Sequence, residues 1–174
     1  MDLKKLSDQY RDELLNNVLP FWLQNSQDKE FGGYFTCLDR EGKVFDTDKF
    51  IWLQGREVWM FSMLYNKVEK RQEWLDCAVQ GGEFLKKYGH DGNYNWYFSL
   101  DRSGRPLVEP YNIFSYTFAT MAFGQLSLAT GNQEYADIAR KTFDIILSKV
   151  DNPKGKWNKL HPDTRNLKNF ALPM

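Results

Sequence analysis

A strand-and-turn pattern that repeats along the chain constrains the fold more than any other feature of the sequence. Residues 34–42 read YFTCLDREG, and residues 97–104 read YFSLDRSG, which is one residue shorter. A weaker third echo runs from Trp157 to Arg165 at nearly the same interval. Repeats at this spacing are typical of units that stack side by side, each burying its apolar face against its neighbours.

The segments between the echoes carry the apolar periodicity of amphipathic helices. It predicts helices over about residues 3–21, 49–70, 72–87, 113–130 and 133–150, with a further helix beginning near Arg165. We expect Pro20 to kink or end the first helix. We attribute Gly81 and Gly82, inside the third helix, to a close helix–helix approach. Gly131 is a typical helix stop.

Two helices and a β-hairpin per unit predict an all-α protein, an α/α toroid whose short hairpins gather on one rim above a central cavity. The chain supplies fewer than three such units, and residues 167–174 carry neither a polar cap nor a helix stop. We therefore expect a truncated piece, because an open array leaves its inner apolar wall uncovered. Such a piece is expected to aggregate or to pair through the exposed seam.

Composition excludes several classes of function. The 174 residues carry no net charge and no basic block, so the electrostatic pattern of a nucleic-acid-binding protein is absent. No apolar run approaches the length of a membrane span, and the first residues do not resemble a signal peptide. Cys37 and Cys77 form neither a CxxC pair nor a disulfide framework. We expect a cytoplasmic protein that binds no nucleic acid, no membrane and no metal.

Arg56 stands in a chain whose 16% aromatic content is typical of a large core or of a pocket for ring-shaped ligands. Helical spacing places Trp52, Arg56, Trp59 and Met63 on one stripe, with the guanidinium group between two indoles. Two interpretations remain open. Arg56 is either a structural residue paired with a carboxylate such as Asp48, or a cation that lines a ligand cavity and stabilises developing negative charge.

Three segments carry a resemblance to a known family. They read FGGYF with LDREG at residues 31–42, WLQGREVW at residues 52–59, and WYFSLD with GRP at residues 96–106. Together they resemble the N-acylglucosamine 2-epimerase family, which also includes cellobiose 2-epimerases and aldose–ketose isomerases of the mannose and sulfoquinovose kind. The W-x-Q-G-R-x-x-W segment is the most specific part, and the resemblance covers essentially the whole chain.

Members of this family fold as a ring of six helical hairpins. The resemblance therefore implies a partial (α/α)6 toroid of about three hairpin units, with residues 1–174 as the N-terminal half of a single toroid domain. It implies a sugar isomerase that interconverts N-acetylglucosamine and N-acetylmannosamine by removing and returning the proton at C2. It implies no required cofactor, and because family members are often homodimers, we carry that expectation over.

The resemblance also implies roles for individual residues. Arg56 matches an arginine that contacts the sugar, and it would stabilise charge rather than act as a base, because arginine does not lose its proton. Trp52 and Gln54 are weaker candidates for binding the substrate. Tyr111 faces the substrate by the same resemblance, although an aromatic residue there also fits simple packing. Asn112 beside it is counted with the substrate-binding candidates and also fits a helix N-cap.

Moving the C2 proton between the two faces of a sugar is best done by two bases, and histidine is the natural choice near neutral pH. The chain contains His90, in a turn sequence where we expect it to be solvated, and His161, in another loop. Neither matches the catalytic histidines of the family, which are expected beyond Met174. We therefore predict that this chain alone does not epimerise a sugar.

Lys159, Arg165 and Lys168 form a small basic cluster near the end of the chain. Loop charges of this kind are most often simply solvated. The alternative is an anion site for ATP, which acts in some acylglucosamine epimerases as an allosteric effector and not as a substrate. No Walker-type glycine loop accompanies the cluster.

Other functions remain open. The nearest is an aldose–ketose isomerase of the mannose type or a cellobiose 2-epimerase, and a non-catalytic sugar-binding or interaction module belongs to another class. A glycoside hydrolase on the same toroid would need two carboxylates that face each other across the cavity. Glu57 and Glu109 are the candidates, but no spacing pairs them. Asp39 and Asp101 belong to the repeated turns and are interpreted as structural.

Overall fold

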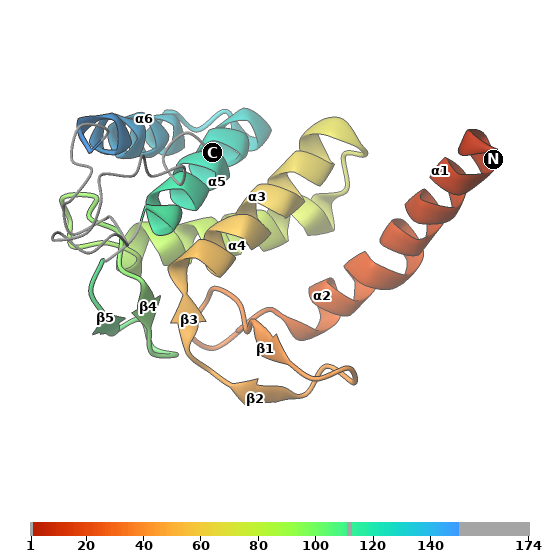
Figure 1. The fold of residues 1–174 in the computed structure, drawn as a ribbon, viewed down its shortest axis with the longest axis horizontal. Helices are drawn as coiled ribbons and strands as arrows, with labels where there is room; N and C mark the ends of the chain where they lie inside the picture. The colour runs from red at the N-terminus through yellow and green to blue at the C-terminus, as the bar shows by residue number, and fades with distance from the viewer. Residues whose placement is uncertain (1, 111–112, 150–174) are drawn as a thin grey trace, which may run out of the picture.

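Helices form most of the computed structural model, which describes residues 2–110 and 113–149. The helices are α1 (Leu3–Glu13), α2 (Leu19–Asn25), α3 (Ile51–Lys67), α4 (Gln72–Tyr88), α5 (Phe114–Thr130) and α6 (Gln133–Ser148). The strands are β1 (Cys37–Leu38), β2 (Val44–Asp46), β3 (Lys49–Phe50), β4 (Ser99–Leu100) and β5 (Pro106–Val108). The predicted all-α class with short strands is confirmed (Figure 1).

Helices α3 and α5 pack against each other at the centre, with α4 against α3 and α6 against α5 (Figure 1). Gly82 on α4 lies directly against the side chain of Leu126 on α5, where a Cβ atom would collide with it. The predicted helix–helix approach is therefore confirmed for Gly82. It is wrong for Gly81, which instead makes room for the ring of Tyr34, a loop residue.

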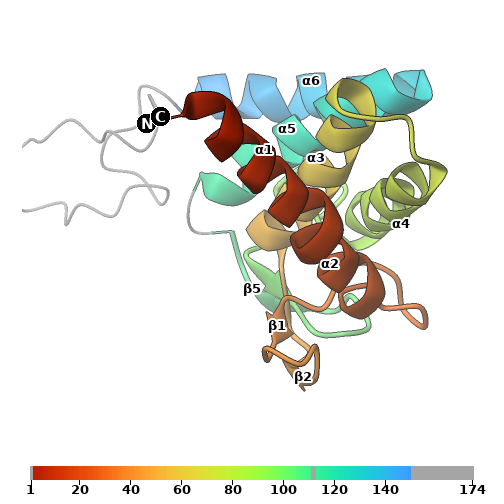
Figure 2. The same ribbon diagram turned by 90° about the vertical axis from the view of Figure 1, so that its right-hand side faces the viewer.

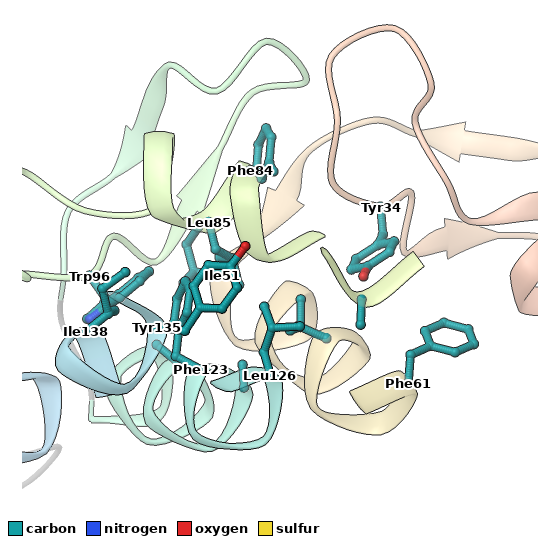
Figure 3. Packing of buried hydrophobic residues seen from close by; sticks show 14 of the residues in the cluster. Tyr34, Ile51, Phe61, Phe84, Leu85, Trp96, Phe123, Leu126, Tyr135 and Ile138 are labelled. Carbon is teal, nitrogen blue, oxygen red and sulfur yellow. The ribbon is translucent and has the colours of Figure 1, made fainter. Parts of the chain in front are cut away.

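The hydrophobic core joins these four helices to the loops before α3 and α5 (Figure 3). The ring of Phe123 lies 5.8 Å from the ring of Trp96 and 5.8 Å from the ring of Tyr135, measured between centroids. The indole nitrogen of Trp96 donates a hydrogen bond of 3.1 Å to the hydroxyl of Thr142, so this buried indole leaves no unmet donor. The apolar face predicted for α6 is confirmed; its buried residues are Tyr135, Ile138, Thr142 and Ile146.

The first helix differs from its prediction. Of the two effects predicted for Pro20, ending the helix is wrong: a π-helical turn over Leu14–Val18 joins α1 to α2, and Pro20 lies in the first turn of α2. A proline has no N–H to donate, and its ring crowds the carbonyl group four residues earlier. The π-helical turn, which is wider than an α-helical turn, covers the part of the helix where this hydrogen bond is missing. No residue of α1 is buried, and Figure 1 shows α1 extending away from the other helices.

The short strands all lie at one end of the helices, as predicted for hairpins on a single rim (Figures 1 and 2). Strands β1 and β2 pair antiparallel, and β3, β4 and β5 form an antiparallel sheet in that order. In the repeated turns, the carboxylate of Asp39 accepts hydrogen bonds from two backbone N–H groups, and that of Asp101 accepts one from the N–H of Arg105. These contacts are those expected of structural turn residues.

Gly131 ends α5 with a φ of 71°, in the left-handed region, which confirms the predicted stop. Within residues 2–110 and 113–149, no helix is both long enough and apolar enough to cross a membrane. The same residues contain no group of three or more metal-ligating side chains of the His, Cys, Asp and Glu types.

Candidate functional site

Arg56 lies on α3 with its side chain exposed. Its guanidinium carbon is 5.7 Å from the ring centroid of Trp52, one helical turn earlier, and 5.4 Å from that of Phe118 on α5. Phe118 comes this close because Gly55 lets the two helices approach: a Cβ atom on Gly55 would lie 3.0 Å from the backbone of Phe118. The two rings are themselves 6.3 Å apart, so the guanidinium group lies against a pair of neighbouring aromatic rings from different helices.

Two details of the predicted surroundings of Arg56 are wrong. The second ring belongs to Phe118 and not to Trp59, because α5 brings a ring that helical spacing within α3 cannot reveal. Arg56 makes no ion pair with Asp48 or with any other described carboxylate. Of the two open interpretations, the geometry favours a cation that faces a cavity.

The rings of Trp52 and Phe118 that Arg56 contacts also line a cavity of about 350 Å³. We call it the aromatic pocket; its lining residues are Trp52, Phe98, Phe114 and Phe118. Trp52 and Phe114 stand in the first turns of α3 and α5. Phe98 is held beside them because its carbonyl oxygen accepts from the N–H of Ile51 (3.0 Å) and its own N–H donates to Val108 (3.0 Å). The pocket therefore lies at the hairpin rim, where the helices begin.

A second cavity of about 300 Å³ also adjoins α3, and Arg56 is one of its lining residues. We call it the mixed pocket; it is lined by Trp22, Thr36, Leu53, Arg56, Glu57, Trp59 and Met60. The hydroxyl oxygen of Thr36 is buried and has no hydrogen-bond partner among the described residues. This cavity combines indole surfaces with polar groups, whereas the walls of the aromatic pocket are almost entirely apolar.

Glu57 is a buried carboxyl group in the mixed pocket, with 7% of the residue exposed. Burial raises its pKa to about 8, against an opposing hydrogen bond with Ser26. The Ser26 hydroxyl is within hydrogen-bond distance of both the carbonyl oxygen of Trp22 (2.7 Å) and Glu57 Oε1 (2.5 Å). The hydrogen bond from Ser26 favours the ionised carboxylate, so it limits the rise in the pKa of Glu57 without reversing it. Glu57 is thus a neutral acid near pH 7.

The predicted substrate-binding residues have different positions. Trp52 lines the aromatic pocket. Gln54 is fully buried: its side-chain oxygen accepts from the N–H of Tyr34 (2.8 Å), and its side-chain nitrogen donates to the carbonyl oxygen of Tyr34 (2.8 Å). The amide of Gln54 therefore holds the loop of Tyr34 in place, and we leave Gln54 out of the proposed binding site.

His90 is the one histidine within the described residues, and the expectation that it is solvated is wrong. Its ring lies 4.8 Å from each of the rings of Tyr94 and Trp96, and burial lowers its pKa. Six residues with predictions attached lie outside the described residues: Tyr111, Asn112, Lys159, His161, Arg165 and Lys168.

From the sequence, Glu57 was a candidate only as one of the two catalytic carboxylates of a glycoside hydrolase. Phe98, Phe114 and Phe118 were not predicted as site residues. Their burial and their convergence depend on how α2, α3, α5 and the hairpin meet. The only available signal was the high density of aromatic residues.

The sequence that places Arg56 beside these aromatic rings matches a known protein family. The sequence profile described as N-acylglucosamine 2-epimerase (GlcNAc 2-epimerase) matches residues 33–171, which include Arg56 and the whole aromatic pocket. The chain belongs to the N-acylglucosamine 2-epimerase family. The predicted resemblance is thereby confirmed.

Two relatives within this family carry the same name. N-acylglucosamine 2-epimerase from Bos taurus is 41% identical over 165 residues, covering 92% of this chain and 39% of the bovine protein. The enzyme from Mus musculus is 43% identical over 149 residues, covering 83% of this chain and 36% of the mouse protein. The chain thus spans well under half the length of these relatives.

A solved structure shows the same fold. Cellobiose 2-epimerase from Bacillus thermoamylovorans matches with a TM-score of 0.77 at 26% identity, covering 91% of this chain and 43% of that protein. The predicted partial (α/α)6 toroid is confirmed.

Proposed function

We propose that this chain forms the N-terminal half of the toroid domain of an N-acylglucosamine 2-epimerase and supplies one wall of its sugar site. The reaction is the interconversion of N-acetylglucosamine and N-acetylmannosamine. The observation that carries the proposal is the exposed guanidinium group of Arg56, which contacts the rings of Trp52 and Phe118, two walls of the aromatic pocket, and has no described carboxylate partner. The identity of 41–43% to enzymes of this name supports it.

The chemistry assigned to Arg56 follows from the charge that the reaction creates. When the ring-opened sugar loses its C2 proton, negative charge develops on the oxygen of the neighbouring C1 carbonyl group. A guanidinium group with five N–H donors, fixed before the reaction begins, stabilises that oxygen. Both neighbouring rings are apolar and offer the guanidinium group no hydrogen-bond acceptor, so its five N–H donors are left for the substrate.

The two bases are assigned to parts of the protein outside the described residues. Within residues 2–110 and 113–149, the one histidine, His90, is packed against Tyr94 and Trp96. No required cofactor enters this proposal. ATP as an effector at Lys159, Arg165 and Lys168 remains a separate proposal, and loss of nucleotide binding in a Lys159→Ala variant of the full-length protein would support it. A homodimer and a cytoplasmic location likewise remain predictions.

The test is an NMR assay of the full-length protein that carries this sequence, mixed with N-acetylglucosamine in heavy water. Deuterium at C2, together with the appearance of N-acetylmannosamine, is the expected result. Exchange with mannose or glucose but not with N-acetylglucosamine would replace the proposal with an aldose–ketose isomerase. Exchange with cellobiose alone would replace it with a cellobiose 2-epimerase. Binding of a sugar with no exchange would indicate a non-catalytic module.

A further inference from the structure

We propose that the aromatic pocket binds the N-acyl group of the substrate and thereby determines the preference for acylated amino sugars. This inference rests on the proposed function and adds to it a location for the acyl group and the residues that select it. The family name implies an acylated sugar, but it does not say which part of the protein recognises the acyl group.

The walls of the pocket determine which part of a sugar can enter it. The four lining side chains, Trp52, Phe98, Phe114 and Phe118, offer almost no hydrogen-bonding surface. A sugar hydroxyl placed among them would lose its water without gaining a partner, which is unfavourable. An alkyl group gains from the same transfer. The only alkyl group on an N-acylated hexosamine is the acyl chain, so the acyl chain is the part that fits.

Arg56 at the edge of the pocket fixes the orientation of that group. The guanidinium group lies over two of the pocket walls, Trp52 and Phe118. In an N-acylglucosamine, the C1 oxygen is separated from C2 by one atom, and the acyl carbonyl oxygen is separated from C2 by two, the amide nitrogen and the carbonyl carbon. With the methyl group in the pocket, both oxygens lie toward the guanidinium group, whose five N–H donors can serve both. The residue proposed to stabilise the reaction is thus placed by the recognition of the acyl group.

The size of the pocket predicts tolerance of longer acyl chains. It measures about 350 Å³, whereas a methyl group is comparable in size to a water molecule, which takes up about 30 Å³ of liquid. We therefore expect N-propanoyl- and N-butanoylglucosamine to be substrates. Each added methylene is expected to lower KM by roughly fourfold until the pocket is filled.

The test compares acyl chains in the full-length protein and in a variant with one wall removed. In Phe114→Leu, KM for N-acetylglucosamine should rise about fivefold, and the ratio of kcat/KM for N-butanoyl- to N-acetylglucosamine should increase because the pocket is wider. Phe143→Leu is the matched control, since Phe143 is a half-exposed helical phenylalanine on α6 outside the pocket. If Phe114→Leu does not fold, Phe98→Leu replaces it.

A binding measurement separates this inference from the proposed function. Saturation of the aromatic protons of the protein should transfer most strongly to the acyl methyl group of bound N-acetylglucosamine. If C2 exchange occurs but the sugar-ring protons receive more saturation than the methyl group, or the acyl preference is the same in Phe114→Leu, this inference is overturned and the proposed function stands. If no N-acylglucosamine exchanges its C2 proton, both are overturned.

Discussion

The ammonium group of Lys49 lies 3.0 Å from the carboxylate of Asp28, and neither side chain is exposed to solvent. Lys49 also donates to the carbonyl oxygens of Gly32 and Arg102, at 2.6 and 2.9 Å, and the guanidinium group of Arg102 binds the same carboxylate. Burial by itself would raise the pKa of Asp28, but the hydrogen bonds from Arg102 and Lys49 outweigh it and lower the pKa to about 2. This cluster joins the loop after α2, strand β3 and the turn of the second hairpin.

Asp28→Asn should destabilise the fold strongly, because it leaves the buried Lys49 cation next to Arg102 without its counter-charge. We expect a loss of about 3–5 kcal/mol in the free energy of unfolding, measured by urea denaturation of the full-length protein. Glu30→Gln is the matched control, since Glu30 pairs with the same Arg102 at an exposed position and should cost less than about 1 kcal/mol. Equal losses in the two variants would contradict the role given to the buried pair.

Glu57→Gln should stabilise the chain at alkaline pH. The folded state holds the Glu57 proton up to a pKa of about 8, whereas the unfolded chain loses it near 4.5. The free energy of unfolding of the parent chain therefore falls as the pH rises between these values, by about 1.4 kcal/mol per pH unit. Glutamine keeps a side-chain oxygen that accepts from the Ser26 hydroxyl and cannot ionise, so this decline disappears.

Thermal unfolding at pH 5 and pH 8 measures the effect. Glu57→Gln should melt well above the parent at pH 8 and close to it at pH 5. Glu41→Gln, a change at an exposed turn residue, should follow the parent at both pH values. A Glu57→Gln variant with an unchanged difference between the two pH values would show that Glu57 is ionised in the folded state.

Arg56→Ala should reduce catalysis without loss of stability. Removing one fixed donor to a developing oxyanion typically costs about 100- to 1,000-fold in kcat, and we expect a loss of that size in C2 proton exchange by the full-length protein. Since Arg56 is exposed and makes no ion pair with a described residue, the melting temperature should stay within a few degrees of the parent. Arg140→Ala, which removes an exposed arginine from α6, is the control and should leave exchange unchanged.

Gly82→Ala and Gly124→Ala should have opposite effects, although both glycines stand inside helices. A Cβ atom on Gly82 would collide with Leu126, so we expect a destabilisation of about 1–3 kcal/mol. No atom outside the helix lies within 4 Å of a Cβ atom on Gly124, so alanine there should stabilise the chain by about 0.5–1 kcal/mol through its higher helix propensity. Urea denaturation of both variants measures the difference, and the same sign for both would contradict the packing described for α4 and α5.

The sequence by itself determined the features that depend on near neighbours along the chain. Helical periodicity located the helices to within a few residues, Gly131 marked the end of α5, and the aspartates of the repeated turns were recognised as structural. The family motif around Arg56 also pointed to the correct fold. These signals are local, because each depends on residues within one or two turns of a helix or within one β-turn.

Only the tertiary structure decided which distant side chains meet. The partner ring of Arg56 is Phe118, 62 positions away and brought near by Gly55, and not Trp59 on its own helix. Gln54 is hydrogen-bonded to the backbone of Tyr34, and Lys49 is hydrogen-bonded to the carboxylate of Asp28. Both contacts join separate elements of the fold. Such contacts depend on the distance and angle between packed helices, which sequence spacing does not encode, so the composition of the site follows from the packing of α3 against α5.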